Sequence, residues 1–372
     1  MEDLVTQTWH GVRVFLTGHT GFKGGWLALW LASKGAVVRG YSLDPTEAKT
    51  TPAIFHAARV FESVDDLRSD ILDRDALLKA MQEFRPDVVF HLAAQALVRL
   101  SYADPLGTYA TNVIGTANVL EAIRGIDSVR AVVVVTSDKC YENREWHWGY
   151  RESDPLGGYD PYSSSKACAE IVSAAYRNSF FNRESSGGSR VLLATARTGN
   201  VIGGGDWSQD RLIPDLIRGF LASETVLIRR PKSVRPWQHV LEPLAGYLRL
   251  AQGLLKGEAE LAEPWNFGPF DEDAWPVDQI ADAMTERWGN GARWAIDANS
   301  SVHEAGYLKL DASKARARLG WRPYLHLGHA LEYTSDWYQA WKSGADMQVY
   351  SLQQIAAYET LMSGHAPSSP IL

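Results

Sequence analysis

Apolar and polar residues are distributed along the first half of the chain in a pattern that separates short strands from longer helices. Short apolar runs, often β-branched and bounded by glycine, proline or polar residues, predict buried strands. We expect these strands at residues 12–16, 36–41, 60–64, 87–92, 131–135 and 191–195. Apolar residues at helical spacing predict helices at residues 25–33, 76–84 and 105–123, and from Pro161 onward. This alternation predicts an α/β fold built on a doubly wound parallel sheet.

The strict alternation loosens beyond residue 198. The pattern there predicts helices at residues 212–221, 240–255, 278–288, 313–319 and 329–341, and a short strand at 265–268. We expect a first domain over 1–198, a smaller mixed α/β domain over 199–345 and a C-terminal extension over 346–372. Residues 236–255 are expected to return to the first domain.

Three glycines, Gly18, Gly21 and Gly24, follow the first strand and precede an apolar helix. In a strand–turn–helix–strand unit, such glycines let the backbone approach a pyrophosphate, and the helix N-terminus offers free N–H groups. This arrangement predicts a Rossmann-type dinucleotide site that includes Phe22. The alternative is a tight turn that needs glycine for its conformation alone.

Polar residues at the ends of the second and third strands bear on the choice of dinucleotide. An acidic residue that binds the adenosine ribose is expected near Ser42, and Asp44 stands two residues further on. No arginine stands at Ser42 itself, although Arg39 is close, so we favour NAD over NADP. Asp70 and Ile71 are candidates to face the adenine, with a solvated loop as the alternative for Asp70.

The fourth strand ends in a turn of small residues, Leu92, Ala93 and Ala94, which would allow a cofactor to lie close to the backbone. Gln95 follows this turn and is a candidate substrate contact. Asn112 lies within the apolar helix that comes next, where its amide must find hydrogen-bond partners.

Polar side chains follow the fifth strand, where ligands bind in parallel sheets. They are Thr136, Ser137 and Asp138. Further along, Tyr162 and Lys166 share one face of a helix. An ammonium beside a phenol favours the phenolate, so Tyr162 is a candidate base. The Tyr-x-x-x-Lys spacing alone is a weak signal, and its value comes from following a dinucleotide site.

The segment 229–239 is both basic and aromatic and includes Arg235, Trp237 and His239. In an acidic protein such a cluster indicates an anionic ligand, most simply a diphosphate. A solvated edge strand is the alternative.

Composition narrows the possible function classes. The 372-residue chain has a net charge of -7 and no dense basic run, which argues against a nucleic-acid partner. Its two cysteines, Cys140 and Cys168, provide neither a disulfide framework nor a metal-binding spacing. The N-terminus is polar, and no apolar run reaches the ~20 residues of a membrane span. We therefore expect a cytoplasmic protein with no membrane partner.

Over residues 10–340 the chain resembles the extended short-chain dehydrogenase/reductases, and within them the nucleotide-sugar 4,6-dehydratases. The resemblance rests on Thr17-Gly18-x-x-Gly21-x-x-Gly24, His91-Leu92-Ala93-Ala94, Asn112, Thr136-Ser137-Asp138, Tyr162-x-x-x-Lys166 and Arg197-x-x-Asn200. The motifs around residues 17–26, 136–141 and 199–207 match most closely the branch that acts on CDP-glucose. The resemblance implies NAD as the cofactor, a first domain that binds it and a second domain that mainly binds substrate.

The resemblance also implies a mechanism. Tyr162, helped by Lys166 and Ser137, removes the proton of the sugar 4-hydroxyl while NAD takes the C4 hydride. Loss of the C5 proton and the C6 hydroxyl then gives an enone, and the hydride returns to C6. Protonated Asp138 is the expected acid for the 6-hydroxyl, which requires a raised pKa.

One residue departs from the pattern of many 4,6-dehydratases. Lys139 stands where they carry the glutamate that is the C5 base. A lysine can act as a base if it is desolvated or lies beside another cation. Otherwise Lys139 steadies the enolate and another group moves the proton, with Glu142 and Tyr141 as unranked candidates.

The resemblance assigns Asn200, Arg211 and Arg235 to the nucleotide diphosphate, and His239 is a further candidate substrate contact. It also implies a homodimer formed through the helices that begin near residues 105 and 161. The rival functions are a nucleotide-sugar 4-epimerase or 4-ketoreductase on the same fold and, more remotely, a non-catalytic dinucleotide sensor. Asp138 and Lys139 argue against the epimerase, and the presence of both Tyr162 and Lys166 argues against the sensor.

Overall fold

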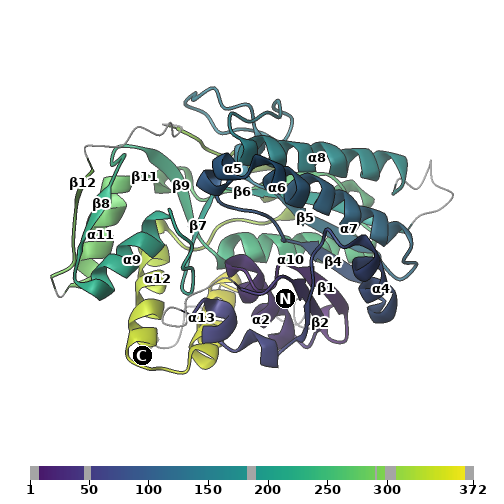
Figure 1. Ribbon diagram of the computed structural model, residues 1–372, viewed down its shortest axis with the longest axis horizontal. Coiled ribbons are helices and arrows are strands. Elements are labelled where there is room, and N and C mark those ends of the chain that lie inside the picture. The colour runs from purple at the N-terminus through teal and green to yellow at the C-terminus, as the bar shows by residue number, and fades with distance from the viewer. Residues whose placement is uncertain (1–7, 46–51, 182–189, 290, 298–306, 365–372) are drawn as a thin grey trace.

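A sheet of seven parallel strands forms the centre of the computed structural model, which describes residues 8–45, 52–181, 190–289, 291–297 and 307–364 (Figure 1). The strand order is β10-β6-β5-β4-β1-β2-β3. The strands are β1 (Arg13–Thr17), β2 (Val37–Ser42), β3 (Asp65–Arg68), β4 (Val88–His91), β5 (Ala131–Val135), β6 (Leu192–Thr198) and β10 (Pro264–Phe267). The order changes direction at β1 and β4, and ligands bind at such a switch point, at the carboxyl ends of the strands.

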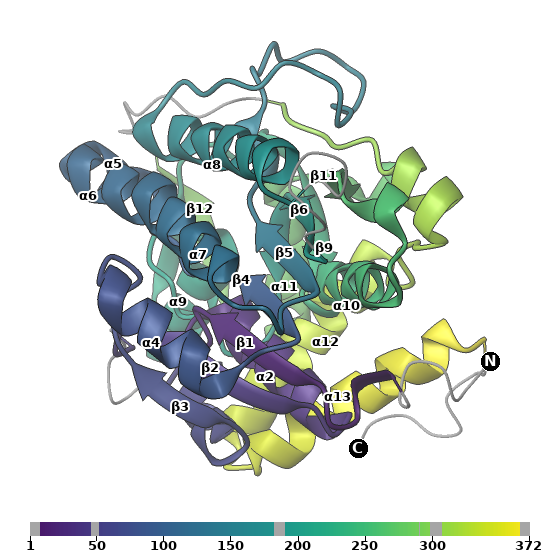
Figure 2. The ribbon, with the colours of Figure 1, turned by 90° about the vertical axis from the view of Figure 1, so that its right-hand side faces the viewer.

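Successive side chains of the inner strands of the sheet enter two different cores. Val133 of β5 packs in one core and Val132 in the other, as the period of two requires. The first core is covered by α2 (Phe22–Ser33) and α10 (Leu241–Lys256), and the second by α4 (Arg74–Phe84), α7 (Gly115–Arg124) and α8 (Pro161–Ser179). Figure 2 shows the sheet between these two helix layers. The predicted doubly wound parallel sheet is confirmed.

The prediction of a strand at residues 60–64 is wrong. A 3₁₀ turn, Val60–Glu62, occupies most of that segment, and the strand β3 follows it. The apolar signal came from Val60, which is buried in the first core, whereas β3 is the edge strand of the sheet and carries the polar sequence Asp-Asp-Leu-Arg.

The helical region expected over residues 105–123 contains a change of helix type. It consists of α6 (Pro105–Tyr109), a π turn (Ala110–Ile114) and α7, and is preceded by the short α5 (Val98–Ala103). Asp104 caps α6 by accepting a hydrogen bond from the Gly107 N–H at 2.9 Å. π turns inside α-helices occur often at functional sites.

The second half of the chain adds two small sheets to one end of the large one (Figure 1). One has the order β11-β9-β7, and the other pairs β12 with β8. Their strands are β7 (Asn200–Ile202), β8 (Thr225–Ile228), β9 (Val234–His239), β11 (Ala274–Pro276) and β12 (Arg293–Ile296). The accompanying helices are α9 (Leu212–Ala222), α11 (Val277–Trp288) and α12 (Leu327–Lys342), whose apolar residues join the first core. Over the described ranges, no helix has both the length and the apolar character needed to cross a bilayer.

The last helix, α13 (Met347–Met362), packs against α2, the helix that follows the glycine turn. Glu359 accepts hydrogen bonds from the Trp30 Nε1 and the Lys34 Nζ, each at 2.7 Å. On the inner side of α13, the Tyr358 hydroxyl donates to the buried Glu242 carboxylate of α10 at 2.7 Å. The C-terminal helix therefore braces both helices that cover this face of the sheet.

The buried Glu242 carboxyl predicts that the docking of α13 depends on pH. Burial raises its pKa to about 7, even though Tyr358 and two backbone N–H groups donate to the carboxylate. Because the folded state holds this proton more tightly than the unfolded state does, the protonated carboxyl contributes fully to stability at any pH below the unfolded-state pKa. That contribution is lost as the pH rises toward about 7.

We predict that Glu242→Gln, which cannot ionise, removes this dependence. Wild-type stability should fall by on the order of 1–3 kcal/mol from mildly acidic to neutral pH, while the variant changes little. Denaturant unfolding at several pH values measures the difference, with Glu83→Gln on the exposed face of α4 as the matched control. Equal pH dependence in all three proteins would contradict the prediction.

Candidate active site

The glycine turn between β1 and α2 is packed against the end of β4. Gly18 has a φ of 79°, and a Cβ added there would lie 2.6 Å from the Ala93 backbone nitrogen. A Cβ on Gly24 would overlap the Gly18 carbonyl oxygen. A Cβ on Gly21 would meet only that same oxygen, at 3.4 Å. Gly18 and Gly24 therefore close the turn, and Gly21 keeps its outer side open.

The N-terminus of α2 is available to an anion. Gly21 is its N-cap and provides no side-chain hydrogen bond, and the first turn holds no acidic residue. Free N–H groups at the positive end of the helix dipole suit a phosphate group. This chemistry and the open side of Gly21 fit the pyrophosphate of a dinucleotide.

Ser42 lies at the carboxyl end of β2, and its Oγ hydrogen bonds to the Thr20 Oγ1 at 2.8 Å. Asp70 accepts a hydrogen bond from the Leu72 N–H at 2.9 Å, which holds the loop after β3. Ile71 is buried against Gly115, where a Cβ would overlap its side chain. Asp44 is exposed, and Arg68 lies 3.8 Å from it.

A chain of buried hydrogen bonds begins behind the glycine turn. The Thr17 Oγ1 accepts from the Leu92 and Ala93 N–H groups, each at 3.2 Å, and donates to the His91 Nδ1 at 2.7 Å. Burial, with a smaller effect from the Lys166 charge, lowers the His91 pKa to about 3, so the ring is neutral. Its Nε2–H then donates to the Thr116 Oγ1 at 3.0 Å.

Thr116 continues this chain by donating to the Asn112 carbonyl oxygen at 2.7 Å. The Asn112 amide binds the Gln95 N–H at 2.8 Å, the Gln95 carbonyl at 3.0 Å and the Ser165 hydroxyl at 2.8 Å. Asn112 therefore finds the partners that its burial requires, and it ties the π turn to α8. The Gln95 side chain donates to the Thr108 Oγ1 at 2.9 Å and is not among the residues that line the cleft, so its assignment as a substrate contact stays a prediction that the structure does not favour.

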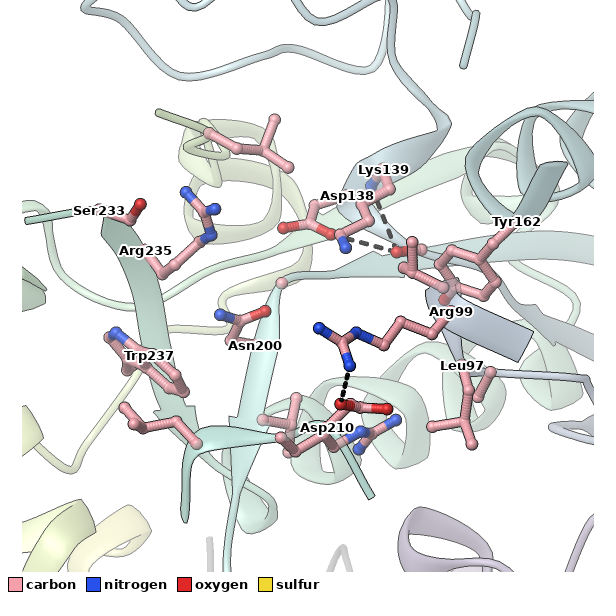
Figure 3. Close-up of a pocket in the computed structure, with 18 of the residues that line it drawn as sticks. Leu97, Arg99, Asp138, Lys139, Tyr162, Asn200, Asp210, Ser233, Arg235 and Trp237 are labelled. Carbon is pink, nitrogen blue, oxygen red and sulfur yellow. Dashed lines mark hydrogen bonds and ion pairs between the residues drawn. The ribbon is translucent and has the colours of Figure 1, made fainter. Parts of the chain in front are cut away.

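A cleft of about 520 Å³ opens at the carboxyl ends of β5 and β6, between the large sheet and the second half of the chain. Figure 3 shows Asp138, Lys139 and Tyr162 along one side, with Arg235 and Trp237 across from them. Ser137, Asp138 and Lys139 occupy this wall because β5 runs directly into the 3₁₀ turn Asp138–Cys140.

Asp138 is a buried carboxyl in the cleft wall. Its Oδ1 accepts a hydrogen bond from the Ser137 Oγ at 3.1 Å. Gly199 leaves room for this carboxyl, because a Cβ there would lie 3.0 Å from the Asp138 Oδ2. Burial raises the Asp138 pKa, and the opposing effects of Lys139, Ser137, Arg235 and Lys23 are smaller. The group is thus biased toward the protonated form that a general acid needs.

Tyr162 and Lys166 project from the start of α8, which Asp160 caps with a reciprocal hydrogen-bond pair to Ser163. The Lys166 Nζ donates to the Val135 carbonyl oxygen at 3.4 Å, and burial lowers its pKa to about 8. Burial raises the Tyr162 pKa, although Ser137 and Arg211 act in the opposite direction. Burial outweighs these two effects, so the Tyr162 pKa is raised and not lowered as the sequence predicted.

The three candidates for the C5 base lie in different settings. The Lys139 Nζ lies 5.9 Å from the centre of the Tyr162 ring, and Lys139 lines the cleft. The Tyr141 hydroxyl is occupied inside the protein, donating to the Asn266 Oδ1 at 2.7 Å and accepting from Arg197 at 2.8 Å. Glu142 lies outside the cleft and pairs with Arg144 at 3.2 Å. Lys139 is the candidate that the geometry favours.

The other side of the cleft is rich in arginine. Arg211 pairs with Asp206 at 3.1 Å, and Arg235 lies on β9 near Asn200 (Figure 3). Arg99 of α5, which the sequence did not single out, reaches across to Asp210 at 2.9 Å. This concentration of guanidinium groups suits a diphosphate.

His239 is a correction to the sequence-based assignment. It is fully buried, with its ring 6.2 Å from that of Trp26 and 5.5 Å from that of Tyr333, and it does not line the cleft. It ends β9 where the chain turns into α10, so the strand carries it into the core. We withdraw His239 as a substrate contact.

A buried ion pair fixes the two strand ends behind the site. The Arg197 Nη2 donates to the Glu170 Oε2 at 2.8 Å, and both side chains are 2% exposed. The Thr195 and Thr136 hydroxyls also donate to Glu170. Burial acts to raise the Glu170 pKa, but Arg197 and these hydrogen bonds outweigh it and hold the pKa below its usual value.

We predict that Glu170→Gln lowers the free energy of unfolding by about 3–5 kcal/mol, because it leaves Arg197 charged and unpaired in the core. Glu121→Gln is the matched control, since it removes a partly exposed pair with Arg124 worth less than about 1 kcal/mol. Denaturant unfolding measures both variants. A loss in the Glu170 variant no larger than that in the control would show that the buried pair is not a major contributor.

The sequence and the fold were compared with known proteins. A family model described as GDP-mannose 4,6 dehydratase matches residues 15–189. The CDP-glucose 4,6-dehydratase of Salmonella typhimurium is 53% identical over 350 residues, which cover 94% of this chain and 97% of that protein. The dTDP-glucose 4,6-dehydratase of Xanthomonas campestris is 28% identical, covering 92% and 98% of the two chains.

Solved structures show the same fold. DesIV, a dTDP-glucose 4,6-dehydratase from Streptomyces venezuelae crystallised with NAD, superposes with a TM-score of 0.76 at 21% identity, covering 91% of this chain and 100% of that one. The epimerase Mth375 from Methanothermobacter thermautotrophicus superposes with a TM-score of 0.78 at 23% identity, covering 91% and 96%. Dehydratases and epimerases thus share this architecture, and the residues in the cleft must distinguish them.

Proposed function

The chain belongs to the nucleotide-sugar 4,6-dehydratases of the extended short-chain dehydrogenase/reductase family, and we propose that it converts CDP-D-glucose to CDP-4-keto-6-deoxy-D-glucose and water with NAD as its cofactor. The observation that supports this activity most directly is the buried Asp138 beside Lys139 and Tyr162 on one cleft wall. Dehydration needs one group that oxidation at C4 does not need, an acid that protonates the leaving hydroxyl. The preference for CDP is supported by the 53% identity to the Salmonella enzyme.

The cofactor is held, in this proposal, by three groups of residues of the first domain. Gly18, Gly21 and Phe22 cradle the pyrophosphate, and Ser42, Asp70 and Ile71 lie toward the adenosine. The backbone of residues 92–94 and the Thr136, Tyr162 and Lys166 side chains lie toward the nicotinamide. NAD, when bound, accepts the C4 hydride and later returns it to C6.

Oxidation at C4 needs a base for the proton of the 4-hydroxyl. Tyr162 is the group we assign, with Ser137 beside it to orient the phenol. Lys166 remains a cation up to a pH of about 8 and supplies part of the positive charge that a phenolate requires. Activity should therefore decline as pH rises above about 8, where Lys166 loses its proton.

Elimination follows because the 4-keto group acidifies C5. Asp138 gives its proton to the 6-hydroxyl, which leaves as water. Lys139, with its amine unprotonated, is the group we assign to accept the C5 proton, and it returns a proton to C5 when the hydride adds to C6. The pKa of Asp138, raised by burial, keeps its proton in place at a higher pH than an ordinary aspartic acid would. The arginines Arg211 and Arg235, together with Asn200, hold the diphosphate across the cleft.

The domain boundaries that we propose separate the residues that bind NAD from those that mainly bind the substrate. Residues 1–198 form the NAD-binding domain, 199–345 mainly the substrate-binding domain and 346–372 an extension. The cover that α10 gives to the large sheet supports the return of residues 236–255 to the first domain. The unpaired thiols of Cys140 and Cys168 are consistent with a cytoplasmic location.

The activity is tested by incubating the purified protein with CDP-glucose, dTDP-glucose and GDP-mannose in separate reactions. Mass spectrometry should show loss of one water from CDP-glucose and little loss from the other two. Loss only with another nucleotide would overturn the CDP assignment but keep the reaction. Inversion at C4, or net oxidation of NADH, without loss of water would replace the proposal by the epimerase or ketoreductase alternative.

We predict that Asp138→Asn reduces the dehydration rate by on the order of a hundredfold or more, because asparagine has no proton to give the leaving hydroxyl. Oxidation at C4 should persist, so reduced nicotinamide accumulates on the protein and is visible in its absorbance. Asp75→Asn, on the exposed part of α4, is the control. Full dehydration by the Asp138 variant would remove this residue from its assigned role.

A homodimer is the proposed assembly. Leu106 of α6, Ile114 of the π turn and Ile171 of α8 are 80%, 55% and 56% exposed. These elements lie along one side of the molecule (Figure 1), and an exposed apolar face of this kind marks an interaction surface. A second copy of the chain would cover it by helix packing.

We predict that replacing Leu106 and Ile171 together by aspartate converts the dimer to monomers, because the charges would be buried in the contact. Light scattering measures the mass of each protein. Ile296→Asp, at an exposed position of β12, should leave the dimer intact. A monomeric wild-type protein, or a dimeric double variant, would contradict the proposed face.

A further inference from the structure

An ion pair joins the two sides of the cleft at Arg99, a residue to which the proposed function assigns no role. The Arg99 Nη1 lies 2.9 Å from the Asp210 Oδ1, and both residues line the cleft. Arg99 belongs to α5, which packs against α8, the helix of Tyr162. Asp210 belongs to the segment that precedes α9 in the second half of the chain. Figure 3 shows the guanidinium reaching from the side of Tyr162 to Asp210.

The segment of residues 206–211 is anchored firmly at its start. The Asp206 carboxylate is buried and pairs with Arg211 at 3.1 Å. The Trp207 Nε1 donates a hydrogen bond to the Pro52 carbonyl oxygen at 2.9 Å. These contacts fix the first residues of the segment to the body of the protein, independently of Arg99.

The tip of this segment, Gln209 and Asp210, is held through the Asp210 carboxylate. Besides Arg99, the Arg229 Nη2 lies 3.4 Å from the same carboxylate oxygen. Over the ranges that the structure describes, neither tip residue makes another hydrogen bond or ion pair. The φ of Asp210 is 58°, a left-handed conformation that an L-residue keeps only with support from its surroundings. The two arginines provide that support.

The place of the tip matters because Arg211, which follows it directly, is assigned to the substrate diphosphate. The diphosphate and the sugar carbon that reacts belong to one molecule, so the distance between their two binding sites must match that molecule. Arg99 is attached to the helix layer that carries Tyr162, and through Asp210 it limits where Arg211 can lie. A contact of this kind lowers the cost of ordering the segment when the substrate binds.

We propose that Arg99 is a positioning residue that acts through Asp210, holding the tip in place so that Arg211 is ready to bind the diphosphate of the substrate. This inference rests on the proposed function. The Arg99 and Asp210 side chains are 43% and 39% exposed, so solvent weakens their attraction. A pair of this strength adjusts the affinity for the substrate and does not hold the fold together.

The test compares Arg99→Gln, Asp210→Asn and the double variant by calorimetric titration with CDP. Asparagine keeps the shape of aspartate and adopts a positive φ as readily, so it removes the charge alone. Each single variant should bind CDP about fivefold more weakly, which corresponds to about 1 kcal/mol. The double variant should bind no more weakly than either single variant, because both changes remove the same pair. With CDP-glucose, KM should rise in the same proportion while kcat stays near the wild-type value.

Two further variants serve as controls. Arg99→Lys keeps the positive charge opposite Asp210 and should recover most of the affinity for CDP. Arg59→Gln removes an ion pair with Asp346 that has the same length, 2.9 Å, and a similar exposure. Neither residue of that pair lines the cleft, so this variant should bind CDP as the wild type does.

Three results would overturn the inference. Weaker binding by the Arg99 variant alone, with unchanged or tighter binding by Asp210→Asn, would show that Arg99 contacts the diphosphate itself. Additive losses in the double variant, or no loss in either single variant, would also contradict a role through the pair. If the wild type binds dTDP or GDP but not CDP, the CDP assignment fails and the same titrations are made with the nucleotide that binds. A wild type that binds none of the three refutes the proposed function, and the inference with it.

Discussion

The buried ion pair of Glu170 and Arg197 is the interaction on which the rest of the site depends. Glu170 belongs to α8, the helix of Tyr162 and Lys166, whereas Arg197 belongs to β6. Because Glu170 also binds the Thr136 and Thr195 hydroxyls, one carboxylate holds a helix and the ends of two strands together. Replacing any partner would leave a polar group unsatisfied in the core, so this wall of the cleft tolerates little change at these positions.

Within this frame, chemistry is divided among groups that differ in charge and solvation. Asp138 is buried, and its raised pKa favours the protonated form. Lys166 is also buried, and its pKa is lowered only to about 8. The cleft therefore offers an acid and a source of positive charge within one wall. In our proposal the arginines across the cleft provide the positive charge that a nucleotide diphosphate needs, so that an acidic protein can bind an anionic substrate.

The features that could be predicted from the sequence are those that depend on residues close together in the chain. The glycine turn, the buried strands and the capped helix of Tyr162 depend on neighbours in the chain, and they are found where the pattern places them. The strand assigned to residues 60–64 failed because an edge strand carries little apolar signal. Asn112 was expected to need partners, but its π turn has no local signature. His239 depends on its tertiary surroundings, so the basic cluster in the sequence misplaced it.

The central claim, transfer of the C4 hydride to C6 through NAD with loss of water between the two hydride steps, is tested most directly with CDP-glucose carrying deuterium at C4. The account predicts a product one water lighter that keeps the deuterium, which nuclear magnetic resonance places in the C6 methyl group even when unlabelled NADH is present in the solution. Deuterium that remains at C4 of an unchanged or inverted sugar would contradict the account and indicate an epimerase. Deuterium lost to the free NADH pool would show that the hydride leaves the site between the two steps.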